Sequence, residues 1–390
     1  MEPRDDVFIV GACRTPIGKF LGAFKDVSAV DLGAIAIAEA LKRAGIPMDS
    51  VQEVSMGLAR QAGNGPNPAR QMALKAAVPK AVPAYTVNMA CGSGMKAVAL
   101  AAQAIRMGEA DVMVAGGAEN MTRVPFFLEH ERLGYRVGHS VAVDGMYQDG
   151  FMDPIAGLVM GETAEVLVEK YNISREEQDR FALSSQQKAE IAMKNGKFAD
   201  EIVSVATPAG VIVADEHPRS GSTLEKLAAL PPVFKKNGSV TAGNSSGITD
   251  GAAALVLCSA EALKRHGLKP LAAIGDCVSV GVEPREMGMG PYPALLKLFK
   301  RTGAKLDDYD LIELNEAFAA QVLAVHREMP LPMERLNVNG GAIALGHPIG
   351  CTGARIIVTL LYEMMKRGAK QGLATLCISG GQGMAMEVLR

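Results

Sequence analysis

The sequence contains no tryptophan, and aromatic residues make up only 5% of its 390 positions. Its 40 lysines and arginines nearly balance 42 aspartates and glutamates, and it has no run of lysines and no aromatic RNA-binding motif, so we expect no nucleic-acid partner. No apolar stretch approaches the roughly 18 residues that a membrane span requires, so we expect no membrane contact. The length and the 48% hydrophobic content predict a globular enzyme of two or more domains.

The sequence also lacks the residue patterns typical of metal sites, disulfide frameworks and nucleotide-binding loops. The six cysteines show no C-x-x-C spacing, and the six histidines form no H-x-x-x-H pair. Residues 11–19, GACRTPIGK, are not a P-loop, because six residues separate the glycines where four are required. We therefore predict no metal ion and no ATP chemistry. Reduced cysteines, with an acidic opening (MEPRDD) unlike a secretory or transit peptide, predict a cytoplasmic protein.

Two cysteines lie in glycine-rich turns: Cys91 in NMACGSGM and Cys377 in CISGGQGMA, with His347 in GGAIALGHPIGCTGAR between them. A thiol attacks a thioester only as the thiolate, so a catalytic cysteine needs a base or a positive potential nearby, and His347 is the candidate base. The glycines allow backbone N–H groups to approach a substrate oxygen that becomes negatively charged. This pattern predicts acyl transfer through a thioester.

Most cysteines in proteins are small buried hydrophobes, and we assign that structural role to Cys13, Cys258, Cys277 and Cys351. Cys91 differs because the alanine-rich segment KAVALAAQAIRMGEADV follows it, which predicts a helix that begins near the cysteine. The N-terminus of that helix is expected to lower the pKa of the thiol.

The chain also contains an internal repeat. Residues 41–57 align without gaps on residues 299–315, and the segment that begins at Val87 resembles the one that begins at Val338. In each copy a helix end is followed by a glycine, a turn and an alternating strand. We therefore predict two layered α/β halves with mixed sheets and right-handed crossovers.

Residues 119–232 interrupt this repeat and are interpreted as an inserted loop or lid domain, with a surface excursion or oligomer contact as the alternative. Within them we predict a helix with Ser174 as N-cap, Glu177 in a capping box and Gly196 as the stop. The predicted division of the chain is 1–118 (first part of the N-terminal half), 119–232 (insertion), 233–268 (completion of that half) and 269–390 (C-terminal half).

Six motifs resemble those of the thiolase family, in the same order and over essentially the whole chain. They are RTPIGKFLG at Arg14, NMACGSGMKA around Cys91, VTAGNSSGITDGAAA at Val240, NEAFAAQ at Asn315, NVNGGAIALGHPIGCTGAR at Asn337 and CISGGQGMA at Cys377. The resemblance implies a thiolase-like fold of two pseudo-repeated βαβαβαββ halves, packed with helices between their sheets and carrying an inserted loop domain. It also implies a homodimer or homotetramer and a place in fatty-acid metabolism.

The resemblance further implies a reversible ping-pong acyl transfer between acetyl-CoA, 3-ketoacyl-CoA and CoA, with no separate cofactor. Cys91 would carry the acyl group, His347 would be its base, and Cys377 would exchange a proton with C2 of acetyl-CoA. His347 and a water held by Asn315 would form one oxyanion hole, and the N–H groups of Cys91 and Ser379 the other. Ser379 stands where the family pattern usually has glycine. We predict that short chains such as acetoacetyl-CoA are processed.

By the same resemblance, a set of residues would contact CoA: Arg219 near the adenine nucleotide, Ala242 and Ser246 on the pantetheine, Met160, Met287 and Phe318 around the thioester, and Phe234. Val159 stands where short-chain biosynthetic members often have histidine, which leaves the acyl-chain preference and the pantetheine contacts open. The physiological direction of the reaction is open as well.

Three alternatives accompany this interpretation. One is a catalytically weak, thiolase-like protein that binds acyl-CoA or acts as a scaffold, but the presence of Cys91, Asn315, His347 and Cys377 argues against it. A decarboxylating condensing enzyme would pair one cysteine with two histidines, and Cys377 argues against that. Asn315 is expected to cap a helix over EAFAAQVLAVHRE, with or without a catalytic role.

Overall fold

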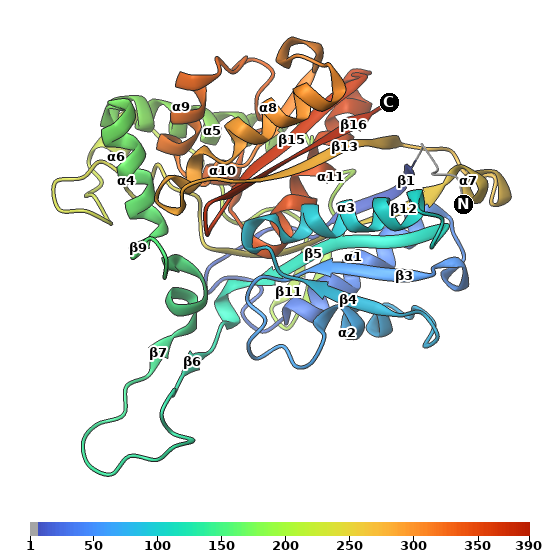
Figure 1. Cartoon of the computed structure of the whole chain (residues 1–390), viewed down its shortest axis with the longest axis horizontal. Coiled ribbons are helices and arrows are strands. Elements are labelled where there is room, and N and C mark those ends of the chain that lie inside the picture. Colours follow the sequence, from blue (N-terminus) through green and yellow to red (C-terminus); the bar gives the residue numbers. More distant parts are fainter. Residues whose placement is uncertain (1–6) are drawn as a thin grey trace.

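The computed structural model describes residues 7–390. The acidic segment MEPRDD, on which the predicted cytoplasmic location partly depends, lies outside the described residues. Ten strands of the described chain form one mixed sheet, in the order β14-β15-β16-β13-β1-β12-β5-β3-β4, with β2 paired to β12 (Figure 1). These strands are β1 (Val7–Arg14), β2 (Gly18–Lys19), β3 (Glu53–Gly57), β4 (Ala84–Val87), β5 (Val112–Asn120), β12 (Thr249–Ser259), β13 (Ala272–Gly281), β14 (Leu311–Leu314), β15 (Gln371–Ile378) and β16 (Gln382–Leu389).

Two helices, α3 (Ser93–Arg106) and α11 (Ile349–Arg367), form a central layer and pack against each other and against strands of both halves. Successive side chains of β12 point to opposite faces of the sheet, so this strand contributes to two hydrophobic cores. Leu255 and Leu257 pack in the core around α3 and α11, whereas Val256 packs in the core on the opposite face of the sheet. The helices on the outer faces are α1 (Ala29–Ala44) and α2 (Pro68–Lys75) in the N-terminal half, and α8 (Pro291–Thr302) in the C-terminal half.

The structure confirms the expected layers and adds a junction between the sheets. β1 pairs antiparallel with β13 through Phe8–Ala273 and Ile9–Ala272. The sheet of one half therefore continues into that of the other at this edge, and the two sheets are not separate.

The internal repeat appears as the same order of elements in both halves. α1 ends at Gly45, with φ 67°, and the chain passes through η1 (Met48–Ser50) into β3. α8 ends at Gly303, with φ 78°, and the chain passes through η6 (Leu306–Asp308) into β14. Both glycines take the left-handed conformation that terminates helices, as the sequence pattern predicts.

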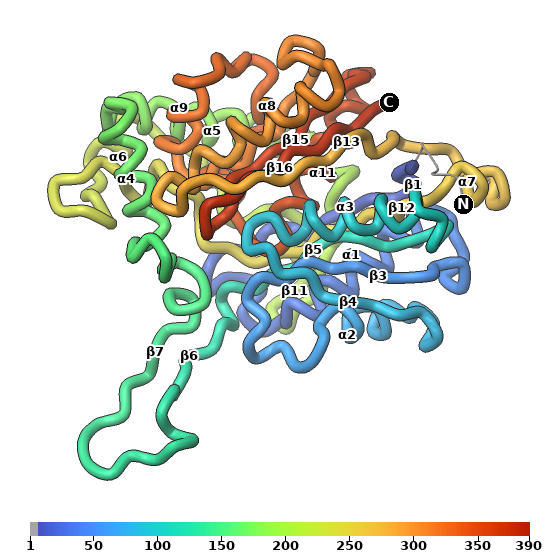
Figure 2. The backbone as a smooth tube through the Cα atoms, in the orientation of Figure 1, coloured from blue at the N-terminus to red at the C-terminus, as the bar shows by residue number. Residues whose placement is uncertain are grey.

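The connection from β5 to β12 leaves the repeat, and its β6–β7 hairpin extends away from the body (Figures 1 and 2). The predicted helix is present as α5, where Ser174 and Glu177 form the capping box and Gly196 has φ 63°. The elements of this connection are η3 (Met121–Arg123), β6 (Phe126–Phe127), β7 (Val143–Asp144), η4 (Tyr147–Phe151), β8 (Met152–Asp153), β9 (Leu158–Val159), α4 (Met160–Tyr171), α5 (Arg175–Lys194), β10 (Val205–Thr207), β11 (Gly210–Ile212) and α6 (Leu224–Ala228).

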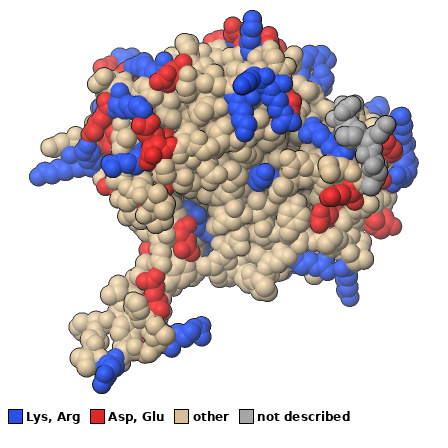
Figure 3. Space-filling view, viewed as in Figure 1, with Lys and Arg blue, Asp and Glu red and all other residues tan. Residues whose placement is uncertain are grey.

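Helices α4 and α5 pack on the C-terminal half, where α4 contacts α9 and α5 contacts both α9 and α10. The remaining elements are η2 (Ala90–Gly92), α7 (Ala260–Arg265), η5 (Pro284–Met289), α9 (Ala319–Glu328) and α10 (Ala342–Leu345). On the face seen in Figure 3, acidic and basic side chains are interspersed. Within residues 7–390, no helix is both long and apolar enough to cross a bilayer.

Candidate active site

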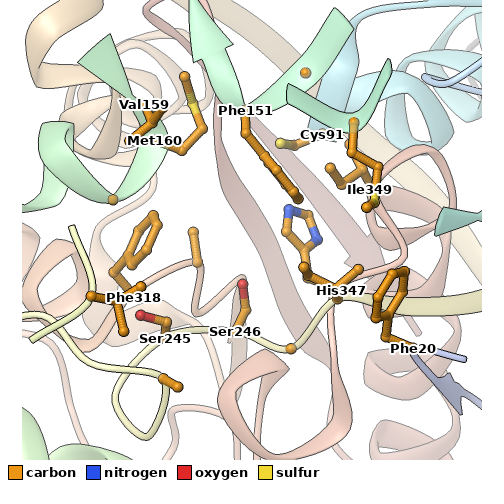
Figure 4. A pocket seen from close by; sticks show the side chains of 18 of the residues that line it. Phe20, Cys91, Phe151, Val159, Met160, Ser245, Ser246, Phe318, His347 and Ile349 are labelled. Atoms are coloured by element: carbon orange, nitrogen blue, oxygen red, sulfur yellow. The ribbon is translucent and has the colours of Figure 1, made fainter. Parts of the chain in front are cut away.

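A cavity of about 720 Å³ lies where the glycine-rich turns of the two halves meet. Cys91, His347, Cys377 and Ser379 all line it, although they are far apart in the sequence. Figure 4 shows Cys91 and His347 facing the same space. The structure therefore brings together the two sulfurs and the imidazole that the sequence singled out.

Close packing of α3 on α11 explains this convergence. A side chain on Gly353 would place its Cβ 2.4 Å from the backbone nitrogen of Met95, and one on Gly94 would place it 2.8 Å from that of Ala354. Only glycine permits so close an approach. Because Cys91 precedes α3 and His347 precedes α11, the contact holds both residues at the same end of the helix pair.

The turn that carries Cys91 is sharply folded. Ala90 has φ 45°, a conformation that is rare for a residue with a side chain. The Ser93 hydroxyl stabilises it by accepting from the backbone N–H of Met89 at 2.9 Å and donating to the Ala90 carbonyl at 2.6 Å. A Cβ on Gly92 would lie 2.5 Å from the side chain of Ile378, so this turn also packs against the end of β15.

Cys377 lies near the end of β15 and is only 1% exposed. Ser379 follows with a negative φ, whereas Gly380 and Gly381 have φ of 83° and 76°. The serine therefore adopts a conformation open to any residue, and the departure from the family's glycine introduces no backbone strain there. The backbone N–H of Ser379 is close enough to the Cys91 sulfur to lower the pKa of that thiol.

The expected lowering of the Cys91 pKa is wrong as a net effect. Burial raises the pKa of the Cys91 thiol, and this outweighs the opposing effects of the Ser379 N–H and the nearby Arg60 charge. Burial and the neighbouring Cys91 also raise the pKa of the Cys377 thiol. Both sulfurs are therefore thiols at neutral pH until a base accepts their protons.

His347 is held as a neutral base. Its Nδ1 lies 2.6 Å from the Thr352 hydroxyl, which itself donates to the Pro348 carbonyl at 3.0 Å. Because that hydroxyl has one proton, Nδ1 must donate to it, which leaves the lone pair on Nε2. Burial, with the charges of Arg355 and Arg60, lowers the pKa of His347 to about 3. At neutral pH the imidazole can thus accept a proton at Nε2.

Asn315 is not among the residues that line this cavity. It follows β14 and is 1% exposed, and both polar atoms of its amide lack a hydrogen-bond partner among the described residues. The expectation that it caps a helix is wrong, because α9 begins only at Ala319, with Phe318 in the N-cap position. Its backbone N–H instead donates to the Thr375 carbonyl at 3.0 Å, which joins it to the sheet.

Every residue that the resemblance assigned to CoA lines this cavity. Phe234 and Phe318 meet edge to face with ring centroids 6.1 Å apart. The ring of Phe234 lies on Gly161, where an added Cβ would be 2.2 Å away. Figure 4 shows Met160, Phe318 and Ser246 around the cavity, and Val159 beside Met160. The full set comprises Met160, Arg219, Phe234, Ala242, Ser246, Met287 and Phe318.

Sequence reasoning missed the apolar wall beside Cys91. Ile349, Met121 and Ala59 form a small core cluster, against which Cys91, Met146, Phe151 and Ile248 pack. Two of these residues lie in motifs that the sequence analysis quotes: Ile349 two residues after His347, and Ile248 within VTAGNSSGITDGAAA. The others come from segments without a motif, which only the tertiary structure brings together.

The sequence analysis also missed a buried carboxylate that joins two loops of the site. Glu119 is fully buried, and its carboxylate accepts the backbone N–H groups of Ala59 and Arg60 at 3.1 Å and of Gly350 at 2.9 Å. It therefore connects the end of β3 to the turn that carries His347. Elsewhere in residues 7–390, Cys13, Cys258 and Cys351 are buried, Cys277 is half-buried, and no cluster of three metal-ligating side chains is present.

Comparison with known proteins gives matches over the whole described chain. Residues 7–261 match the family model "Thiolase, N-terminal domain", and residues 268–390 match "Thiolase, C-terminal domain". The chain is 53% identical to an acetyl-CoA acetyltransferase of Syntrophomonas wolfei, over 98% of each chain, and 52% identical to one of Pseudomonas aeruginosa, over 99% of each. The structure of human mitochondrial 3-ketoacyl-CoA thiolase in complex with CoA superposes with a TM-score of 0.96, at 42% identity, over 99% of this chain and 98% of that one.

Proposed function

Because this chain belongs to the thiolase family and is an enzyme of that class, we propose that it transfers acyl groups reversibly between CoA thioesters, with Cys91 as the acyl carrier. The proposed substrates are acetyl-CoA, CoA and short 3-ketoacyl-CoA such as acetoacetyl-CoA. The observation that carries this proposal is the convergence of Cys91, His347 and Cys377 on one cavity.

In thiolysis, His347 takes the proton of the Cys91 thiol at Nε2, and the thiolate attacks the 3-keto carbon. The C2–C3 bond breaks, and its electron pair passes to C2 of the departing acetyl-CoA as an enolate. Cys377 protonates C2, acetyl-CoA leaves, and the Cys377 thiolate then takes the proton held by His347, so that both groups are neutral again. The thiol of free CoA loses its proton to His347 and attacks the acyl group, which releases the shortened acyl-CoA and the Cys91 thiolate, and His347 returns the proton to that thiolate. In condensation, Cys377 removes a C2 proton from acetyl-CoA, and the enolate attacks acyl-Cys91.

Both directions place negative charge on a thioester oxygen. For the enolate, we propose that His347 acts together with a water bound to the amide of Asn315, whose buried polar atoms have no protein partner among the described residues. For the tetrahedral intermediate, the proposed donors are the backbone N–H groups of Cys91 and Ser379. The effect of the Ser379 N–H on the pKa of the nearby Cys91 thiol supports this assignment.

For CoA, we propose that the nucleotide lies toward Arg219 and the pantetheine passes Ala242 and Ser246. Met160, Met287 and Phe318, with Phe234, would then surround the thioester. The presence of all these side chains on the walls of one cavity supports the assignment. With valine at position 159, that wall is less polar than histidine would make it.

The finer organisation is also proposed. We infer a cytoplasmic homodimer or homotetramer that acts in fatty-acid metabolism, needs no cofactor besides CoA thioesters, and contains an inserted unit at 119–232. The exposed β6–β7 hairpin supports an oligomer contact, because Leu133 and Val137 are 85% and 95% exposed in the single chain.

Mixing the purified protein with acetoacetyl-CoA and CoA tests the proposed activity. We expect consumption of acetoacetyl-CoA with formation of two equivalents of acetyl-CoA, and loss of this activity in Cys91→Ala. Tight CoA binding by a folded wild-type protein without turnover would instead support a scaffold role.

A further inference from the structure

Arg60 is a buried cation on the wall of the active-site cavity. It follows β3 and is only 5% exposed, and it lines the same cavity as Cys91. Its charge is close enough to affect the pKa of both Cys91 and His347. None of the roles proposed above requires an arginine at this position.

The guanidinium lies beside the apolar cluster that contains Cys91. A Cβ on Gly150 would lie 1.9 Å from Nη2 of Arg60, so the planar group rests directly on the backbone of η4. The neighbouring Phe151 and Met146 belong to the apolar cluster around Cys91. Arg219, the arginine assigned to the nucleotide, belongs to a different segment of the wall.

Arg60 also has unused hydrogen-bonding capacity. Its Nε is buried without a hydrogen-bond partner, and across residues 7–390 no carboxylate oxygen lies within 4.0 Å of its guanidinium. The negative charge of Glu119 partly compensates the positive charge of Arg60. The carboxylate oxygens of Glu119, however, accept hydrogen bonds from the backbone N–H groups of Ala59, Arg60 and Gly350 and not from the guanidinium. A buried cation in this state is stabilised by an anionic ligand that accepts its hydrogen bonds.

We propose that Arg60 binds a carboxylate at the far end of the acyl group carried by Cys91, so that the preferred 3-ketoacyl-CoA substrates are short chains that end in a carboxylate. The fork of an arginine matches a carboxylate in two parallel hydrogen bonds. The apolar side chains of Met146, Phe151 and Ile349 suit the methylene groups between the two ends. This inference rests on the proposed thiolase function and specifies its substrate class.

The reaction is the thiolysis already described, with a different acyl group. From 3-oxohexanedioyl-CoA, attack of the Cys91 thiolate on C3 and cleavage of C2–C3 release acetyl-CoA. The butanedioyl group remains on Cys91. Attack by CoA then yields butanedioyl-CoA and restores the thiolate.

The test compares kcat/KM for three substrates of matched length: 3-oxohexanedioyl-CoA, its terminal methyl ester and 3-oxohexanoyl-CoA. We expect the wild type to favour the dicarboxylic substrate by roughly tenfold to a hundredfold, the range given by hydrogen bonds to a charged group. Arg60→Gln and Arg60→Met should remove this preference, mainly through a raised KM for the dicarboxylic substrate. Because the charge of Arg60 also affects the pKa of Cys91 and His347, the ratio of kcat/KM between the substrates is the readout. Thermal unfolding followed by circular dichroism checks that each variant is folded.

Two further variants sharpen the result. Gly150→Ala keeps the charge but displaces the guanidinium, so it should also reduce the preference. Arg180→Gln removes an exposed arginine of α5 and should leave it unchanged. A wild type that favours 3-oxohexanoyl-CoA, or an Arg60→Gln variant that loses activity equally on all three substrates, would overturn the proposal. Because 3-oxohexanoyl-CoA would still be consumed in the first case, the thiolase function itself would stand. Absence of thiolysis with every substrate would refute both.

Discussion

Replacement of Thr352 by valine tests how the protein sets the tautomer of His347. The Thr352 hydroxyl accepts the Nδ1 proton at 2.6 Å because its own proton goes to the Pro348 carbonyl. Valine has a similar shape but no acceptor, so the productive tautomer would bury an unpaired N–H. That penalty is about 1–3 kcal/mol, which corresponds to a loss of about 5-fold to 150-fold in the population of the reactive base.

The assay is thiolysis of acetoacetyl-CoA with kcat and KM measured separately. Thr352→Val should lower kcat by that factor with little change in KM, because the base acts on the thiol and not on CoA binding. Thr352→Ser is the matched control, since it keeps the hydroxyl, and it should remain close to the wild type. A folded Thr352→Val variant with kcat within twofold of the wild type would refute the assignment of the tautomer.

Three other predictions follow from the geometry. Gly353→Ala should destabilise the protein by roughly 1–3 kcal/mol in urea unfolding, because the new Cβ meets the backbone of α3 at 2.4 Å; an unchanged midpoint would contradict the close packing. Between pH 7.5 and pH 5 the unfolded state gains a proton on His347 that the folded state, with a pKa of about 3, does not. This should cost the wild type about 2 kcal/mol of stability that His347→Asn does not lose, and equal losses in both would contradict the buried neutral imidazole. Ser379→Gly should leave kcat within about twofold, because Ser379 has a negative φ, and a gain of tenfold would show that the serine strains the site.

Local chemistry made much of the fold predictable. Ser174 and Glu177 define the start of α5 through a capping box, and Gly45 and Gly303 end equivalent helices because both take positive φ. These features depend on neighbouring residues only, so a short stretch of sequence contains the whole signal.

Features that depend on the tertiary structure could not be predicted in this way. The thiol of Cys91 lies at a helix N-terminus, which predicts a lowered pKa, but burial by distant segments raises it. Asn315 resembles an N-cap, yet α9 begins only at Ala319, with Phe318 as its N-cap residue. Arg60 lies in a segment without a recognised motif, and only the tertiary structure shows that it packs on η4 and lines the cavity.

The central claim is that Cys91 carries the acyl group. Brief incubation with acetoacetyl-CoA without added CoA, followed by acid quenching and peptide mass spectrometry, measures this directly. We predict an acetyl group on the peptide that contains Cys91, which is lost when CoA is added before the quench. Acetylation of Cys377 in its place, or turnover by the Cys91→Ala variant, would contradict the account.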